Sequence, residues 1–394
     1  MLEILLAILA GLLVGTIFGL VPGLHPNTII LLIPFIAQLS LPPFVIIAFV
    51  VALGISNTFV DFIPSMLLGA PEAGNELAVT PAHRMLLQGN GYDAVKLAVI
   101  GGLGAIILVL ALLPAIVFSI PRIYELSLPF TYALLIFIVL VMILHEKTNR
   151  KKSTALLCFF LAGLTGLSLQ YMPIDRNIVL FPVLSGLFGV SALMFSKKGT
   201  KVPARRKQIH VTGRQQRRSI LFGSAGGIVS GLLPGVGSSE LATLASADKN
   251  EKSFLMTLGA ITISNTLLSI MALWLIGKSG SGIASALEQL VQIGFNETVF
   301  IAAIALAVAA ISSLITLKLA KKSLGIIENI DYSKISKAII AFIILMTVVF
   351  SGIYGLLLLG TCTALGIFAG LAGIRRGVLM GVLILPTIIF YLPF

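Results

Sequence analysis

The sequence predicts an all-α polytopic membrane protein, built from two related halves that lie in opposite orientations. Three observations carry this prediction: an apolar composition, a series of long uncharged segments, and an internal repeat. The chain of 394 residues is 58% hydrophobic and 11% charged, and its mean hydropathy is +1.08. Because a soluble domain carries about 25% charged residues, this composition excludes a soluble globular protein.

Two series of apolar segments are long enough to cross a bilayer. In the first half they cover residues 43–70, 95–119, 129–145, 153–169 and 177–195. In the second half they cover residues 253–277, 297–318, 337–352, 354–373 and 377–393. We expect residues 2–20 to be a further membrane helix, since they lack the basic start and the cleavage site of a signal peptide. The expected domains are a first repeat at 1–195, a basic cytoplasmic linker at 196–218 and a second repeat at 219–394.

Two stretches of the sequence repeat one another around a Pro-Gly pair. GTIFGLVPGLHPNT begins at Gly15 and GIVSGLLPGVGSSE begins at Gly227, an offset of 212 (227 − 15). A Ser-Asn-Thr element follows at residues 56–58 and again at residues 264–266, an offset of 208 (264 − 56). Apolar composition alone does not generate these polar matches, so we infer a duplication. Helix-breaking segments within repeats are where membrane transporters hold their substrates.

The distribution of basic residues predicts the orientation of the halves. Nine Lys or Arg residues and no acid lie between Lys197 and Arg218, and cytoplasmic loops are enriched in such residues. If residues 146–152 and 196–218 lie in the cytoplasm, both termini are expected on the opposite, outer side of the membrane. The segments 43–70 and 253–277 then run in opposite directions. Each half is expected to hold one re-entrant Pro-Gly hairpin plus about five transmembrane helices.

The turns of the two hairpins are the predicted substrate site. Irregular backbone at membrane depth is tolerated where it lines a cavity, and its amide groups, with the start of the following helix, favour an anion. The expected substrate-binding residues are the turn residues, the polar residues after them and two asparagines: Pro22, Gly23, His25, Asn27, Thr28, Asn57, Pro234, Gly235, Gly237, Ser238, Ser239 and Asn265. Asparagines in membrane helices also serve helix packing, so the sequence leaves both roles open for this pair.

A second set of residues is expected to couple transport to a cation. Asp61 lies one helical turn after Asn57 within a spanning segment, where an acid indicates a function by default; a place beside a water-filled vestibule is the alternative. Glu240 either caps the helix after the second turn or coordinates the cation. The expected ion-coupling residues are Asp61, Glu240, Ser56, Thr58, Ser264 and Thr266. Sodium and the proton both suit this set, and we expect no cofactor and no metal other than sodium.

No pattern in the sequence supports an enzyme. The chain has no Walker A motif, no Cys/His spacing typical of a metal site and no nucleophile elbow, so we expect transport to use a gradient instead of ATP. The net charge of +12 is concentrated in the predicted cytoplasmic loops. This placement favours membrane lipid, not nucleic acid, as the partner of the basic residues.

The motifs GLVPGLHPNT, GLLPGVGSSE and LLGAPEAGNELAVTPAHRMLLQGNGYDAVKLA resemble the large membrane subunit of the tripartite tricarboxylate transporters. The resemblance covers most of the chain and is most specific in these motifs. It implies a secondary active, ion-coupled symporter of di- or tricarboxylates that binds its substrate at the Pro-Gly turns. It also implies a small membrane subunit and an extracytoplasmic binding protein as partners. The alternative is a translocase for polyprenyl phosphate, because anion-binding turns suit a phosphate headgroup equally well.

Overall fold

The computed structural model of the chain describes residues 1–21, 36, 38–68, 78–174, 176–194, 211–232, 238–246, 250–278, 281–327 and 332–392. Every regular element within these ranges is a helix. Eight helical segments of the described chain are long and apolar enough to cross a bilayer, and two shorter apolar helices accompany them. The predicted all-α polytopic membrane fold is therefore confirmed.

The first half of the described chain contains α1 (Leu2–Leu20), α3 (Pro43–Val60), η2 (Pro64–Leu68), α4 (Val79–Leu87), α5 (Gly91–Ala111), α6 (Leu113–Ser127), η4 (Leu128–Phe130), α7 (Thr131–Leu144), α8 (Asn149–Ser168), η5 (Leu169–Tyr171), α9 (Arg176–Leu184), η6 (Ser185–Val190) and α10 (Ser191–Leu193). The second half contains α11 (Gly213–Leu232), α12 (Ser238–Ala245), α13 (Glu251–Leu275), α14 (Gly282–Leu290), α15 (Phe295–Ile327), α16 (Tyr332–Ala372), η7 (Arg376–Met380) and α17 (Gly381–Tyr391). Both η2 and η6 are π-helices.

Two helix boundaries differ from those expected, and a third agrees with the prediction. The predicted span 95–119 is divided at Leu112, where α5 ends and α6 begins with Pro114 in its first turn, a position that suits proline. The predicted linker is helical from Gly213, because Thr212 accepts a hydrogen bond from the amide of Gln215 and caps α11. The predicted break between residues 352 and 354 is present within α16 as Gly352, whose φ is 57°.

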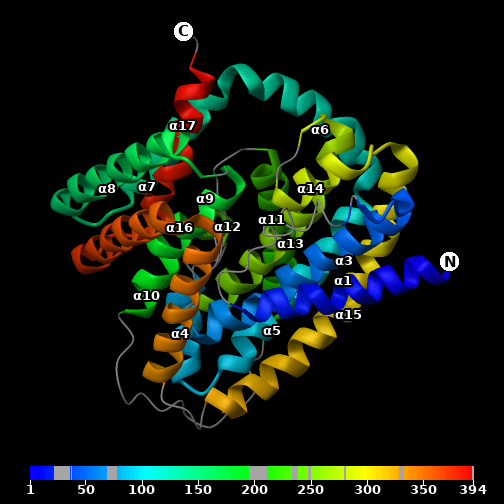
Figure 1. The fold of residues 1–394 in the computed structure, drawn as a ribbon, viewed down its shortest axis with the longest axis horizontal. Coiled ribbons are helices and arrows are strands. Elements are labelled where there is room, and N and C mark those ends of the chain that lie inside the picture. The colour runs from blue at the N-terminus through cyan, green and yellow to red at the C-terminus, as the bar shows by residue number, and fades with distance from the viewer. Residues whose placement is uncertain are drawn as a thin grey trace.

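The helices form two groups, and each group takes helices from both halves of the chain (Figure 1). In the core group, α1, α3 and α5 of the first half pack against α11, α13 and α15 of the second. In the outer group, α8, α9 and η6 pack against α16 and α17. Helix α6 crosses the top of the view between the groups. The two halves are therefore interlocked.

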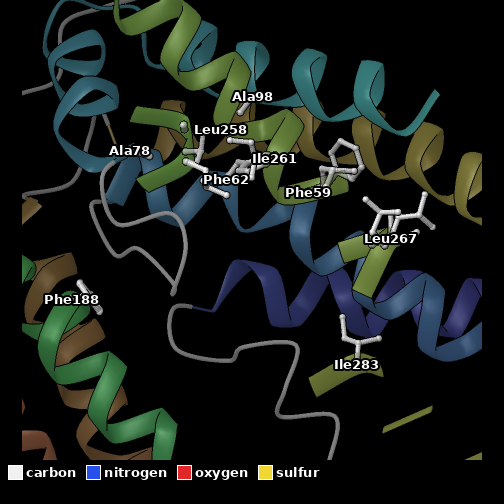
Figure 2. Packing of buried hydrophobic residues seen from close by; sticks show 14 of the residues in the cluster. Phe59, Phe62, Ala78, Ala98, Phe188, Leu258, Ile261, Leu267 and Ile283 are labelled. Atoms are coloured by element: carbon white, nitrogen blue, oxygen red, sulfur yellow. The ribbon is translucent and has the colours of Figure 1, made fainter. Parts of the chain in front are cut away.

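The hydrophobic core is centred on α3 and α13. Phe59 and Phe62 pack edge to face, with ring centroids 6.4 Å apart, and both are fully buried beside Leu258 and Ile261 of α13. Figure 2 shows these side chains between the two helices, while Phe188 lies apart on the outer group. Because α3 is apolar on every face, it can occupy this enclosed position. The candidate site is built on these two central helices.

Three polar contacts join segments that are far apart in the sequence. They are Arg84 with Glu251 (3.1 Å), the Lys151 ammonium with the carbonyl of Gly373 (2.6 Å), and the amide of Arg375 with Glu146 (2.8 Å). The Lys278 ammonium lies 5.4 Å from the ring centroid of Tyr124, and a hydrogen bond with Tyr124 raises the pKa of Lys278. The placement of both termini outside stays a prediction.

Candidate functional site

Three glycines allow α1 to lie directly against the backbone of α3. They are four residues apart and so share one face of the helix. A Cβ atom at any of the three would collide with a backbone carbonyl oxygen of α3, so only glycine permits this approach. The pairs are Gly11 with Phe49, Gly15 with Leu53 and Gly19 with Asn57. From one pair to the next, the residue number increases in both helices, so α1 and α3 run in the same direction.

The second half has equivalent glycines on α11. A Cβ atom at Gly223 or Gly227 would collide with a backbone carbonyl oxygen of α13, whereas the atom nearest to the Cβ position of Gly231 is the Asn265 side-chain oxygen, at 3.5 Å. The pairs are Gly223 with Thr257, Gly227 with Ile261 and Gly231 with Asn265. Each glycine is 212 residues after its counterpart in α1 (223 − 11), and each partner is 208 residues after its counterpart in α3 (257 − 49). The helix contact itself, and not only the sequence motif, is therefore duplicated. That the two copies are inverted across the membrane stays a prediction.

The parallel packing requires the chain to reverse direction in each half. Helix α1 ends at Leu20, with Gly19 beside Asn57 and Val60, whereas the chain enters α3 at Pro43, at the other end of the contact. In the second half, α12 lies beside α11, with Leu241 3.9 Å from the Cβ position of Gly226. We call α1 and α11 the hairpin helices. Helix α1 ends beside the middle of the candidate membrane span Pro43–Leu68, and α11 ends beside the middle of the candidate span Glu251–Leu275. The reversals thus begin at membrane depth.

The Ser-Asn-Thr elements of the two halves meet in the middle of the core group. The hydroxyl oxygens of Thr58 and Thr266 are 3.3 Å apart, and these residues occupy equivalent positions in the repeat (266 − 58 = 208). Asn57 is fully buried beside Gly19, and the side-chain oxygen of Asn265 lies 3.5 Å from the Cβ position of Gly231. We call Asn57, Thr58, Asn265 and Thr266 the central junction. It lies where both hairpin helices end.

The serines of the two Ser-Asn-Thr elements, Ser56 and Ser264, form hydrogen bonds outside the central junction. The Ser56 hydroxyl donates to the carbonyl of Leu12 (3.2 Å) and is 3.1 Å from the Thr16 hydroxyl, so it ties α3 to α1. The Ser264 hydroxyl donates to the carbonyl of Ala260 (2.5 Å), on its own helix, beside Gly227. Both serines are fully buried. These contacts give the serines a packing role along the hairpin helices.

Asp61 is buried one turn beyond the central junction, with 3% of its surface exposed. Its amide donates to the carbonyl of Asn57 (2.8 Å), and the Ser65 hydroxyl donates to its carboxylate (2.9 Å). The Cβ position of Gly19 is 3.2 Å from the Asp61 amide nitrogen, so the end of α1 lies against this residue. The Asp61 backbone thus lies against the end of α1, and Ser65 orients the carboxylate.

The helix changes form directly after Asp61. Pro64 has no N–H group, so it cannot donate to the carbonyl of Val60, and the next turn is the π-helix η2. Such π-turns occur frequently at functional sites. Sequence reasoning missed Ser65, although its position four residues after Asp61, with Pro64 between them, is a usable signal. It also missed the glycine spacing on α1 and α11.

Many of the residues predicted to bind substrate lie outside the described residues. These are Pro22, Gly23, His25, Asn27, Thr28, Pro234, Gly235 and Gly237. Ser238, Ser239 and Glu240 form the first turn of α12, and the Ser238 side chain is buried. Within the ranges that the structure describes, no three His, Cys, Asp or Glu residues gather as metal ligands. The described part of the site therefore consists of the central junction, Asp61 and Ser65.

A cross-link should form across the central junction. Because the two hydroxyl oxygens are 3.3 Å apart, the double variant Thr58→Cys/Thr266→Cys should form a disulfide under mild oxidation, detected as a shift in gel mobility after proteolysis in the 196–218 segment. The native cysteines, Cys158 and Cys362, are buried and give a low background. The matched pair Ser56→Cys/Ser264→Cys has the same offset but faces other helices, so it should stay reduced. Equal cross-linking of both pairs would contradict the junction.

Comparison with known proteins gives two matches. The profile of the family described as "Tripartite tricarboxylate transporter TctA family" matches residues 5–381, which include both hairpin helices and the central junction. A protein of Methanocaldococcus jannaschii described as uncharacterized is 32% identical over 386 residues, which cover 93% of this chain and 94% of that protein. No solved structure matches the chain.

Proposed function

Because the chain belongs to the tripartite tricarboxylate transporter TctA family, we propose that it moves small di- or tricarboxylates across the membrane together with a cation. Family membership and the eight candidate spans within the described chain make it a multi-pass membrane protein of a transporter family.

One observation carries the proposal: the two hairpin helices end at the same place, beside the central junction. Each half supplies a glycine-lined hairpin helix and an asparagine there, and the two threonines are in contact. A substrate held between two such ends contacts both halves at once. The affinity for the substrate then depends on how the helices of the two halves are arranged around it. Binding can therefore shift the balance between the arrangements that alternate during transport. The turns Pro22-Gly23 and Pro234-Gly235 follow these ends in the sequence and are proposed to supply amide groups to the carboxylates.

Asp61 is proposed to bind the coupling cation. Asp61 is 3% exposed, its carboxylate accepts a hydrogen bond from Ser65, and its backbone lies beside the end of α1. An ionised acid in such a position is unfavourable, and a proton or sodium ion would neutralise it during the cycle. Asp61 lies one turn from Asn57, so the cation and the substrate would occupy neighbouring positions. This proximity favours binding of the two together, because opposite charges close to one another attract strongly away from water.

The family name also suggests partners. We propose that a small membrane subunit and an extracytoplasmic binding protein cooperate with this chain, as the description of the family as tripartite indicates. The binding protein would deliver the substrate to the outer face.

Uptake into proteoliposomes tests the substrate class. The purified chain should accumulate labelled citrate or succinate under an imposed sodium or proton gradient. Movement of a short-chain polyprenyl phosphate, with no uptake of any carboxylate, would overturn the proposal in favour of a lipid-carrier translocase. Each assay should be repeated with the accessory subunits, so that a need for delivery is not mistaken for a lack of transport.

A further inference from the structure

Two loops of the outer group form one strongly basic surface. The connection between α7 and α8 and the first turn of α8 contact the connection between α16 and η7 through Glu146 with Arg375 and through Lys151 with Gly373. The two connections lie side by side at the left edge of Figure 1. We call the basic residues of these loops the basic rim: Lys147, Arg150, Lys151, Lys152 and Arg375.

The charges of the basic rim are not balanced by nearby acids. Glu146 lies within the rim, but it is 6% exposed and its carboxylate accepts the backbone amide of Arg375. Lys147, Arg150 and Arg375 are exposed, and in the described part of the chain none of them pairs with a carboxylate. The rim therefore presents concentrated positive charge to its surroundings.

Two helix starts add to this positive charge. Helix α8 begins at Asn149, with Thr148 as its cap, so Arg150, Lys151 and Lys152 fall in its first turn. Arg375 directly precedes η7. A helix start carries partial positive charge, so basic residues there are unfavourable unless an anion is close. By contrast, Lys318, Lys321 and Lys322 lie in the last third of α15, away from any helix start.

An apolar surface continues directly from the rim. Leu144 at the end of α7 and Leu371 near the end of α16 precede the two loops and are 61% and 73% exposed. Further exposed apolar residues extend along the same helices: Phe137, Leu140 and Phe368. A ligand that fits both parts has an anionic head and apolar chains.

We propose that the basic rim is a binding site for the headgroup of an anionic phospholipid, with the acyl chains along α7 and the second part of α16. The headgroup phosphate neutralises the two helix starts and their basic side chains. Bound lipid then strengthens the packing of the α7–α8 hairpin against the α16–η7 connection, which the two backbone-mediated contacts also join. This site is separate from the central junction and does not depend on what the protein transports.

Native mass spectrometry tests the proposal. The detergent-purified protein is titrated with phosphatidylglycerol or with phosphatidylcholine, and we expect a clear preference for phosphatidylglycerol. The triple variant Lys147→Gln/Arg150→Gln/Arg375→Gln should lower the apparent affinity for phosphatidylglycerol by about two orders of magnitude, since each basic residue near an anionic surface contributes about fivefold. Inorganic phosphate should compete only weakly, because it lacks acyl chains.

The matched control removes equal charge elsewhere. Lys318→Gln/Lys321→Gln/Lys322→Gln should bind phosphatidylglycerol as tightly as the unchanged protein. An equal loss in both triple variants, or equal binding of the two lipids by the unchanged protein, would overturn the proposal and leave only general attraction to basic loops. Gel filtration and thermal unfolding in phosphatidylcholine check folding. If the rim variant does not fold, the single variant Lys147→Gln should still show about a fivefold loss.

Discussion

Replacement of Asp61 by asparagine should abolish the accumulation of substrate against a gradient. The variant keeps the size of the side chain and can still accept the hydrogen bond from Ser65, but it removes the charge that a cation would neutralise. With the membrane potential held at zero, a roughly 50-fold concentration gradient of one coupled cation is worth about 2.3 kcal/mol and supports about 50-fold accumulation of the substrate. Uptake of labelled carboxylate into proteoliposomes should show this ratio for the unchanged protein and no accumulation for Asp61→Asn.

The matched control for this variant is Asp93→Asn. Asp93 is also 3% exposed and belongs to the same group of helices, but it lies in the first turn of α5, where an acid stabilises the helix start. We expect this variant to respond to the gradient as the unchanged protein does. An Asp61→Asn variant that still accumulates substrate would remove Asp61 from the coupling mechanism. Loss of accumulation in both variants would show that the effect is not specific to Asp61.

Replacement of Gly19 by alanine should disrupt the protein far more than the same change at the equivalent Gly231. A Cβ atom at Gly19 would lie 2.7 Å from the carbonyl oxygen of Asn57 and 2.9 Å from the Cβ of Val60. The end of α1 would have to move away from α3, and overpacking of this kind costs about 1–3 kcal/mol. We expect a lower midpoint of thermal unfolding and a large loss of uptake, because the displaced helix end lies beside Asn57 and Asp61.

Gly231→Ala is the internal control because it has room for a methyl group. Its nearest neighbours would be the Asn265 side-chain oxygen at 3.5 Å and the Leu268 Cβ at 3.6 Å, both ordinary contact distances. Alanine also favours a helix over glycine by about 1 kcal/mol, so the thermal midpoint should stay the same or rise. Equal losses of stability at the two positions would contradict the close packing described for α1.

The fold class could be predicted because composition and segment length decide it. Without water in the bilayer core, long apolar segments must satisfy their backbone hydrogen bonds as helices. The two Ser-Asn-Thr elements lie on the central helices α3 and α13, and the contact between Thr58 and Thr266 brings the two copies together. Where the two halves of a duplicated chain face one another, equivalent residues can lie in contact. The offset of a sequence repeat therefore helps to predict which residues meet.

The arrangement of the helices in two groups could not be predicted in the same way. Spans such as α8 and α17 are apolar on many faces, and nothing in their periodicity states which partner each will contact. Gly166 lies against the backbone of Val382, far along the chain, and this pairing depends on the complete fold. The role of Ser65 depends likewise on the turn at Pro64 that aims its hydroxyl at Asp61. Sequence patterns give the local element, whereas the partner comes from tertiary packing.

Protection of the central junction by substrate tests the account most directly. The Thr58→Cys/Thr266→Cys protein, which should transport carboxylate when reduced, is oxidised for increasing times with and without citrate or succinate, and the cross-linked fraction is measured. A substrate held between the hairpin ends should slow the cross-link, while a non-transported anion of equal charge should not. If transport is intact in the reduced protein but saturating substrate leaves the cross-linking rate unchanged, the substrate does not bind at this junction.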